Sequence, residues 1–193
     1  MTFQFGTQNE LLYAFYGAST NLATFTAEDN LLKTYPACEV PSLRQILGVT
    51  GLRASSLKVK ARGLAGTTGT PTYTFTLRLI TSETWSAGGL VLGASGAVPA
   101  SSGVTLAPWE LEADIGLVSL PAAASATATV KTLGTVNGAA FSADGSIPAN
   151  NVSPTLATLD LAAKYYLWLS CACSASSASN LINCQMLKLY GEN

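Results

Sequence analysis

Two neighbouring stretches decide the fold of this chain: Leu57-Lys58-Val59-Lys60-Ala61-Arg62-Gly63 and Thr72-Tyr73-Thr74-Phe75-Thr76-Leu77-Arg78-Leu79. Successive side chains of a β-strand point to opposite faces of its sheet. The first stretch alternates cations with small or apolar residues, and the second alternates polar residues with large apolar ones. Each stretch therefore predicts a strand with one buried and one solvent-facing side. The Gly- and Thr-rich segment 65–71 between them predicts a hairpin connection.

Shorter alternating or apolar runs recur along the rest of the chain. They lie near Phe25 and at 110–117, 124–136, 156–161, 165–173 and 181–189. With the two stretches above they make about eight strands, and links rich in Gly, Ala, Ser and Pro separate them. We predict an all-β fold, an eight-stranded antiparallel jelly-roll sandwich with an extended N-terminal arm. An immunoglobulin-like sandwich is the alternative, because alternation does not order strands within a sheet.

The first quarter of the chain is less regular than the remainder. We interpret 1–50 as the N-terminal arm with the first strand, and 51–193 as the remainder of a single β-sandwich domain. One helical turn is expected at 42–47, and Gly48 ends it. The long links 84–108 and 137–153 are predicted as surface loops, since too few residues flank them for two independent cores.

The composition limits the chemistry that the chain can perform. It contains no histidine, 11% of its residues are charged, and its net charge is −1. Without histidine, the Ser/His/Asp and Cys/His schemes and most zinc sites are absent. The weak charge argues against a nucleic-acid partner, and no apolar run is long enough for a membrane helix. We therefore predict a protein that is not an enzyme and has no cofactor or metal, with a charge-poor surface suited to protein contacts.

Four cysteines are present, Cys38, Cys171, Cys173 and Cys184. No signal peptide is apparent, so we expect thiols kept reduced in a cytoplasm and buried for structural reasons. A bridge from Cys171 to Cys184 across neighbouring strands is the alternative.

Three carboxylates, Glu110, Glu112 and Asp114, alternate along one predicted strand and share one of its faces. A pair of carboxylates is the acid/base machinery of glycosidases, but those pairs come from different elements across a cleft. We interpret the three as a solvated face or as partners of the cations on 57–63. Those cations, Lys58, Lys60 and Arg62, are interpreted either as the guard of an edge strand or as a docking patch for an acidic neighbour.

Several segments carry a resemblance to a known group of proteins. They are Tyr165-Tyr166-Leu167-Trp168-Leu169-Ser170, the Ser/Ala-rich turn and strand 174–185, the central segments 56–63, 67–71 and 73–79, and 109–114. Over roughly residues 18–190 the chain resembles small virion proteins of tailed bacteriophages, in which a Trp-containing strand precedes a Ser/Ala-rich turn and a final strand. The resemblance implies a virion β-sandwich of the capsid-decoration, minor-capsid or tail kind, and its jelly-roll decoration proteins imply a homotrimer.

The expected function is decoration and cementing of the outer capsid by protein–protein contacts. The expected partners are the major capsid protein and further copies of the chain, in a virion assembled in the host cytoplasm. Alternatives are a tail or baseplate accessory, or a carbohydrate-binding module that uses Trp85 and Trp109 at loop ends. The contact residues are expected among the arm, the basic stripe and one loop end. They are Phe3, Phe5, Leu11, Tyr13, Phe15, Lys58, Lys60, Arg62 and Trp85.

Overall fold

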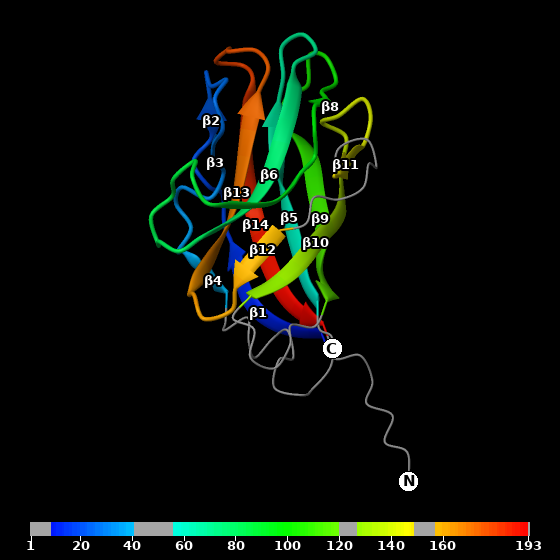
Figure 1. Ribbon diagram of the computed structural model, residues 1–193. Helices are drawn as coiled ribbons and strands as arrows, with labels where there is room; N and C mark the ends of the chain where they lie inside the picture. Colours follow the sequence, from blue (N-terminus) through cyan, green and yellow to red (C-terminus); the bar gives the residue numbers. More distant parts are fainter. Residues whose placement is uncertain (1–8, 41–55, 120–126, 149–156, 193) are drawn as a thin grey trace.

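The computed structural model describes residues 9–40, 56–119, 127–148 and 157–192. Within these ranges the chain forms strands and loops and no helix, so none of them holds a helix that could cross a membrane. The strands form two antiparallel sheets that face each other and run along one long axis (Figure 1). The prediction of an all-β sandwich is confirmed.

The larger sheet contains eight strands. They are β1 (Asn9–Tyr16), β2 (Leu22–Ala23), β5 (Ser56–Gly66), β9 (Ala107–Ser119), β10 (Thr127–Asn137), β11 (Gly145–Ile147), β12 (Ala157–Asp160) and β14 (Leu181–Glu192). The smaller sheet contains six. They are β3 (Asp29–Asn30), β4 (Cys38–Val40), β6 (Thr72–Ile80), β7 (Leu90–Ala94), β8 (Val98–Pro99) and β13 (Tyr165–Cys173).

The main strands pair in a nested order. From the outside of the sequence inwards, β1 pairs with β14, β4 with β13, β5 with β9, and β6 with β7, all antiparallel. These pairs fall alternately in the larger and the smaller sheet. The pattern is that of one long hairpin wrapped around a core, which favours the jelly roll over the immunoglobulin-like alternative. Strands β10 to β12 extend the larger sheet beyond β9.

The structure differs from the sequence prediction at the least regular segments. Residues 9–16, expected in the arm, form the edge strand β1, and Phe25 lies between β2 and β3 instead of in a strand. The link 84–108 contains β7 and β8, and 137–153 contains β11. These strands are only two to five residues long, so they give too little alternation to detect. The helical turn at 42–47 lies outside the described residues.

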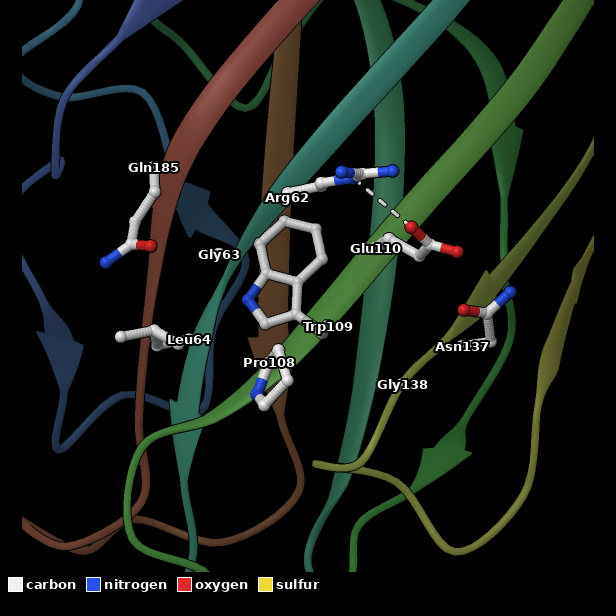
Figure 2. A pocket seen from close by; sticks show the side chains of 9 residues that line it. All are labelled: Arg62, Gly63, Leu64, Pro108, Trp109, Glu110, Asn137, Gly138 and Gln185. Atoms are coloured by element: carbon white, nitrogen blue, oxygen red, sulfur yellow. Dashed lines mark ion pairs between the residues drawn. The ribbon is translucent and has the colours of Figure 1, made fainter.

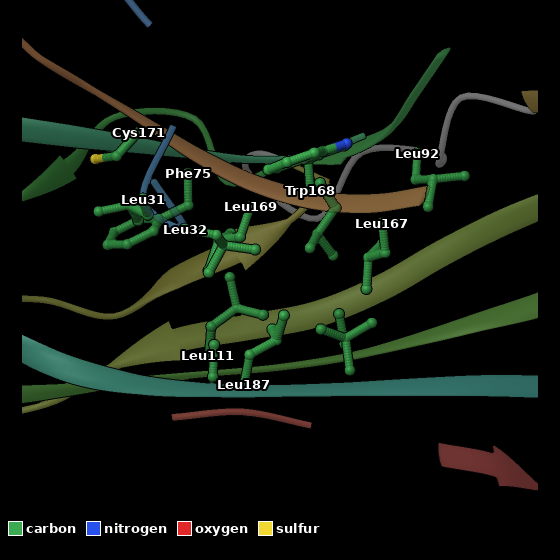
Figure 3. Close-up of a cluster of buried hydrophobic side chains, with 14 of the residues drawn as sticks. Leu31, Leu32, Phe75, Leu92, Leu111, Leu167, Trp168, Leu169, Cys171 and Leu187 are labelled. Atoms are coloured by element: carbon green, nitrogen blue, oxygen red, sulfur yellow. The ribbon is translucent and has the colours of Figure 1, made fainter. Parts of the chain in front are cut away.

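The core lies between the sheets and follows the predicted alternation. Tyr73, Phe75 and Leu77 of β6 are fully buried, as are Val59 and Ala61 of β5. In Figure 3, Leu167 and Leu169 of β13 point across the sandwich towards Leu111 of β9 and Leu187 of β14. The alternation of these strands therefore marks a shared hydrophobic interior.

All four cysteines are buried free thiols, as expected. The bridge alternative was wrong, because Cys171 lies on β13 in the smaller sheet and Cys184 on β14 in the larger one. Burial raises the pKa of Cys38 to about 12 and that of Cys184 to about 11. These thiols therefore stay protonated at neutral pH, and protonated buried thiols are poor nucleophiles.

Candidate binding surfaces

The outer face of the larger sheet carries a ladder of opposite charges on β5 and β9. Strand β5 lies between β14 and β9, so its cations do not guard an edge and that interpretation was wrong. Each cation lies directly opposite a carboxylate. The register pairs are Lys58 with Asp114, Lys60 with Glu112, and Arg62 with Glu110. The interpretation of the carboxylates as partners of these cations is confirmed.

Lys58 is the most connected member of this charge ladder. Its Nζ lies 3.1 Å from Glu192, 3.4 Å from Asp114 and 3.5 Å from Glu112. The hydrogen bond to Glu192 is the largest cause of a raised Lys58 pKa. The hydrogen bond from Lys60, at 3.0 Å, is the largest cause of a lowered Glu112 pKa. A glycosidase acid needs the opposite shift, towards protonation near neutral pH.

A hollow of about 430 Å³, lined by both polar and apolar groups, lies at the end of the charge ladder (Figure 2). Its rim comes from four adjacent strands of the larger sheet. The rim residues are Gln185 on β14, Arg62 on β5, Glu110 on β9 and Asn137 on β10. Arg62 Nε lies 3.2 Å from Glu110 Oε2. We refer to this site as the rim hollow. Among the described residues no cluster of three or more His, Cys, Asp or Glu is arranged to hold a metal ion.

Local irregularities of the backbone shape the rim hollow. The register between β14 and β5 shifts from Cys184 to Met186, so Gln185 is the extra residue of a β-bulge. The bulge is anchored because Gly17 N–H donates to Gln185 O at 2.9 Å. At the other side of the hollow, β10 ends at Asn137, and the chain turns away from the sheet at Gly138, whose φ is 133°. A Cβ at position 138 would lie 2.5 Å from Pro108 O, so this turn requires glycine.

Trp109 lies at the floor of the rim hollow but is almost wholly buried. It is 1% exposed, its ring centroid is 5.0 Å from that of Phe75, and its Nε1–H donates to Asn183 O at 3.1 Å. The indole fits because Gly63 has no side chain, since a Cβ there would lie 2.8 Å from the indole and 1.9 Å from Asn183 O. Trp109 is therefore a core residue, and its interpretation as an exposed sugar platform was wrong.

Strand β1 forms one edge of the larger sheet. Within the described ranges it pairs with β14 alone. Leu11 is 52% exposed and Tyr16 63% exposed. Tyr13 and Phe15 are half-buried instead, because Tyr13 Oη donates to Pro36 O at 2.8 Å and the Phe15 ring lies 4.0 Å from that of Tyr35. Of the predicted contact residues on β1, Leu11 is thus the one that faces solvent.

The remaining predicted contact residues do not join one site. Trp85, in the loop between β6 and β7, is half-buried and packs edge-on against Trp168 of β13 in the smaller sheet, with ring centroids 6.0 Å apart. Phe3 and Phe5 lie outside the described residues. The rim hollow was not predicted from the sequence, although Gly63 interrupts the residue pattern just after Arg62 and marks the close approach of Trp109.

The chain was compared with protein families, curated proteins and solved structures. No protein-family model and no curated protein matches it. Among solved structures, it is similar to the CBM2 module of the evolved Dit of Lactobacillus casei BL23 phage J-1, with a TM-score of 0.32 and 9% identity. The match covers 96% of this chain and 96% of the other.

Proposed function

We propose that the protein is a structural component of a tailed-phage virion that decorates and stabilises the outer capsid through non-covalent contacts. The observation that carries this proposal is the edge strand β1, with its exposed Leu11 and Tyr16. The sequence resemblance to phage virion proteins supports a role in the virion. The proposed partners are the major capsid protein and further copies of the chain in a homotrimer.

The composition of β1 supports a contact role for its edge. An edge strand presents backbone N–H and C=O groups that another chain can pair with, and soluble proteins usually protect such edges with Lys or Pro. After Glu10 at its start, the rest of β1, residues 11–16 with the sequence Leu-Leu-Tyr-Ala-Phe-Tyr, contains neither a charge nor a proline. Strand addition to such an edge combines backbone hydrogen bonds with pockets for alternate side chains. We therefore assign the edge to a neighbouring subunit in the particle.

Reconstitution on capsids tests the proposal. The purified chain is added to expanded capsids of the phage that encodes it, prepared without this protein, and co-sedimentation and heat resistance are measured. We expect binding and a raised capsid melting temperature. Leu11→Lys and Tyr16→Lys are each expected to weaken binding by about tenfold, the effect of losing one well-packed contact residue.

Leu133→Lys is the matched control, because Leu133 is similarly exposed but lies on β10, which is separated from β1 by three strands of the same sheet. Its binding should equal that of the unaltered chain. Failure of the unaltered chain to bind or protect capsids, or an equal loss in Leu133→Lys, overturns the proposal. A few copies per purified virion, where decoration requires many, would place the protein in the tail or baseplate instead.

A further inference from the structure

We propose that the rim hollow binds an uncharged saccharide. Its walls come from four neighbouring strands of one sheet, and its volume of about 430 Å³ lies in the range of small-molecule sites, roughly 300–1,000 Å³. This inference is independent of the proposed capsid contact, which uses β1 at the edge of the sheet.

The charges at the rim favour a neutral ligand. Arg62 and Glu110 form an ion pair at 3.2 Å and are the two charged residues that line the site. An anion would compete with Glu110 for the guanidinium, and a cation would compete with Arg62 for the carboxylate. A neutral ligand hydrogen-bonds to both groups and leaves the ion pair in place.

The rim's hydrogen-bonding groups match those of a sugar. Arg62 offers donors, Glu110 offers acceptors, and the amides of Asn137 and Gln185 offer both. Within the described part of the chain, these two side-chain amides have no hydrogen-bond partner, so both are available to a ligand. Adjacent hydroxyl groups on a pyranose ring both donate and accept hydrogen bonds, so they can pair with several of these rim groups at once. An apolar ligand has no groups that can do so.

Apolar groups complete the wall of the rim hollow. Pro108 is exposed and Leu64 half-exposed, and both line the site. They give the C–H face of a pyranose ring a surface to pack on. A second hollow of about 320 Å³, between β9 and β10, shares Glu110 and Asn137 with the first. A second sugar unit would extend into it, so we expect disaccharides to bind more tightly than monosaccharides.

Titration of the ¹⁵N-labelled chain tests this inference. The probes are glucose, galactose, mannose, rhamnose and N-acetylglucosamine with their disaccharides, and glucuronic acid and N-acetylneuraminic acid serve as charged comparisons. At least one neutral sugar is expected to shift the backbone amide signals of Gly63, Gly138 and Gln185 at millimolar concentration. The absence of shifts with every neutral sugar, or stronger binding of the charged ones, overturns the inference.

Amide deletions locate the binding. Gln185→Ala and Asn137→Ala should each weaken binding by about fivefold, the effect of one lost hydrogen bond. The matched control is Lys131→Ala, an exposed residue of β10 that lines neither hollow. Since both amides lack internal partners, the unfolding midpoints of the variants should stay unchanged. Unaltered binding in the double variant, with the fold intact, contradicts the assignment of the site.

Discussion

The outer faces of the two sheets use the same kind of ion pair in opposite surroundings. On the larger sheet the outer end of the charge ladder lies in solvent, with the Arg62 side chain 64% exposed, while Lys58 at the other end is 21% exposed. On the smaller sheet Arg78 of β6 donates two hydrogen bonds of 2.6 Å to Glu28, and these side chains are only 13% and 22% exposed. Ser170 of β13 also donates to Glu28.

This difference separates a structural ion pair from a solvent-facing one. Water and salt screen the exposed Arg62–Glu110 pair of the charge ladder, so this pair contributes little to stability. The Arg78–Glu28 pair is bidentate and largely withdrawn from water, so removal of one partner leaves a buried charge unpaired. The Arg78–Glu28 pair thus anchors the loop before β3, and the Arg62–Glu110 pair stays at the surface of the larger sheet.

The largest effect is expected from breaking the buried pair. Glu28→Ala should lower the free energy of unfolding by about 3 kcal/mol, because Arg78 loses its counter-charge in a poorly hydrated place. Urea unfolding at neutral pH measures it, with Glu110→Ala on the charge ladder as the matched control. An equal loss in the two variants would remove the distinction between the faces. Replacing both Glu28 and Arg78 by Met should recover most of the loss.

Acid should act mainly through Glu28. The Arg78 hydrogen bond lowers its pKa in the folded state, so its contribution is present above the unfolded pKa, about 4.3, and is lost as pH falls through the folded value. The stability difference between the unaltered chain and Glu28→Gln should therefore shrink below this pH. Glu112→Gln should alter the acid dependence less, since Glu112 is more exposed. Urea midpoints across the acid range decide between them, and a larger effect at Glu112 contradicts the comparison.

Lys58 should show an intermediate effect, because it alone on the charge ladder contacts three carboxylates. Lys58→Met should cost about 1 kcal/mol, since the carboxylates then repel one another with no cation between them. This loss of stability should be smaller in ~1 M salt, where the Debye length is only about 3 Å and charge repulsion is screened. A loss independent of salt would assign the effect to packing of the lysine stem instead.

The smallest effect is expected at Arg62. Arg62→Ala should change the free energy of unfolding by no more than about 0.5 kcal/mol, as for other solvent-exposed pairs. Thermal and urea unfolding measure it together. A loss comparable with that of Glu28→Ala would show that the outer end of the charge ladder is structural.

The sequence predicted what depends on local alternation and missed what depends on distant partners. β5, β6 and β13 were predicted closely, because their side chains alternate or form an apolar run along the strand. β1 was missed because the bulge at Leu12 shifts the alternation within a run of apolar residues. Trp109 was misplaced because its burial depends on Gly63 of another strand. The rim hollow requires four strands to meet, which no single segment encodes.

A reconstruction of the virion that carries this chain tests the central claim most directly. We predict that the chain lies on the outer capsid, with the outward edge of β1 paired with or covered by a neighbouring subunit and the charge ladder facing away from that contact. A particle in which the β1 edge faces solvent, while the ladder or the smaller sheet forms the contact, would contradict the account.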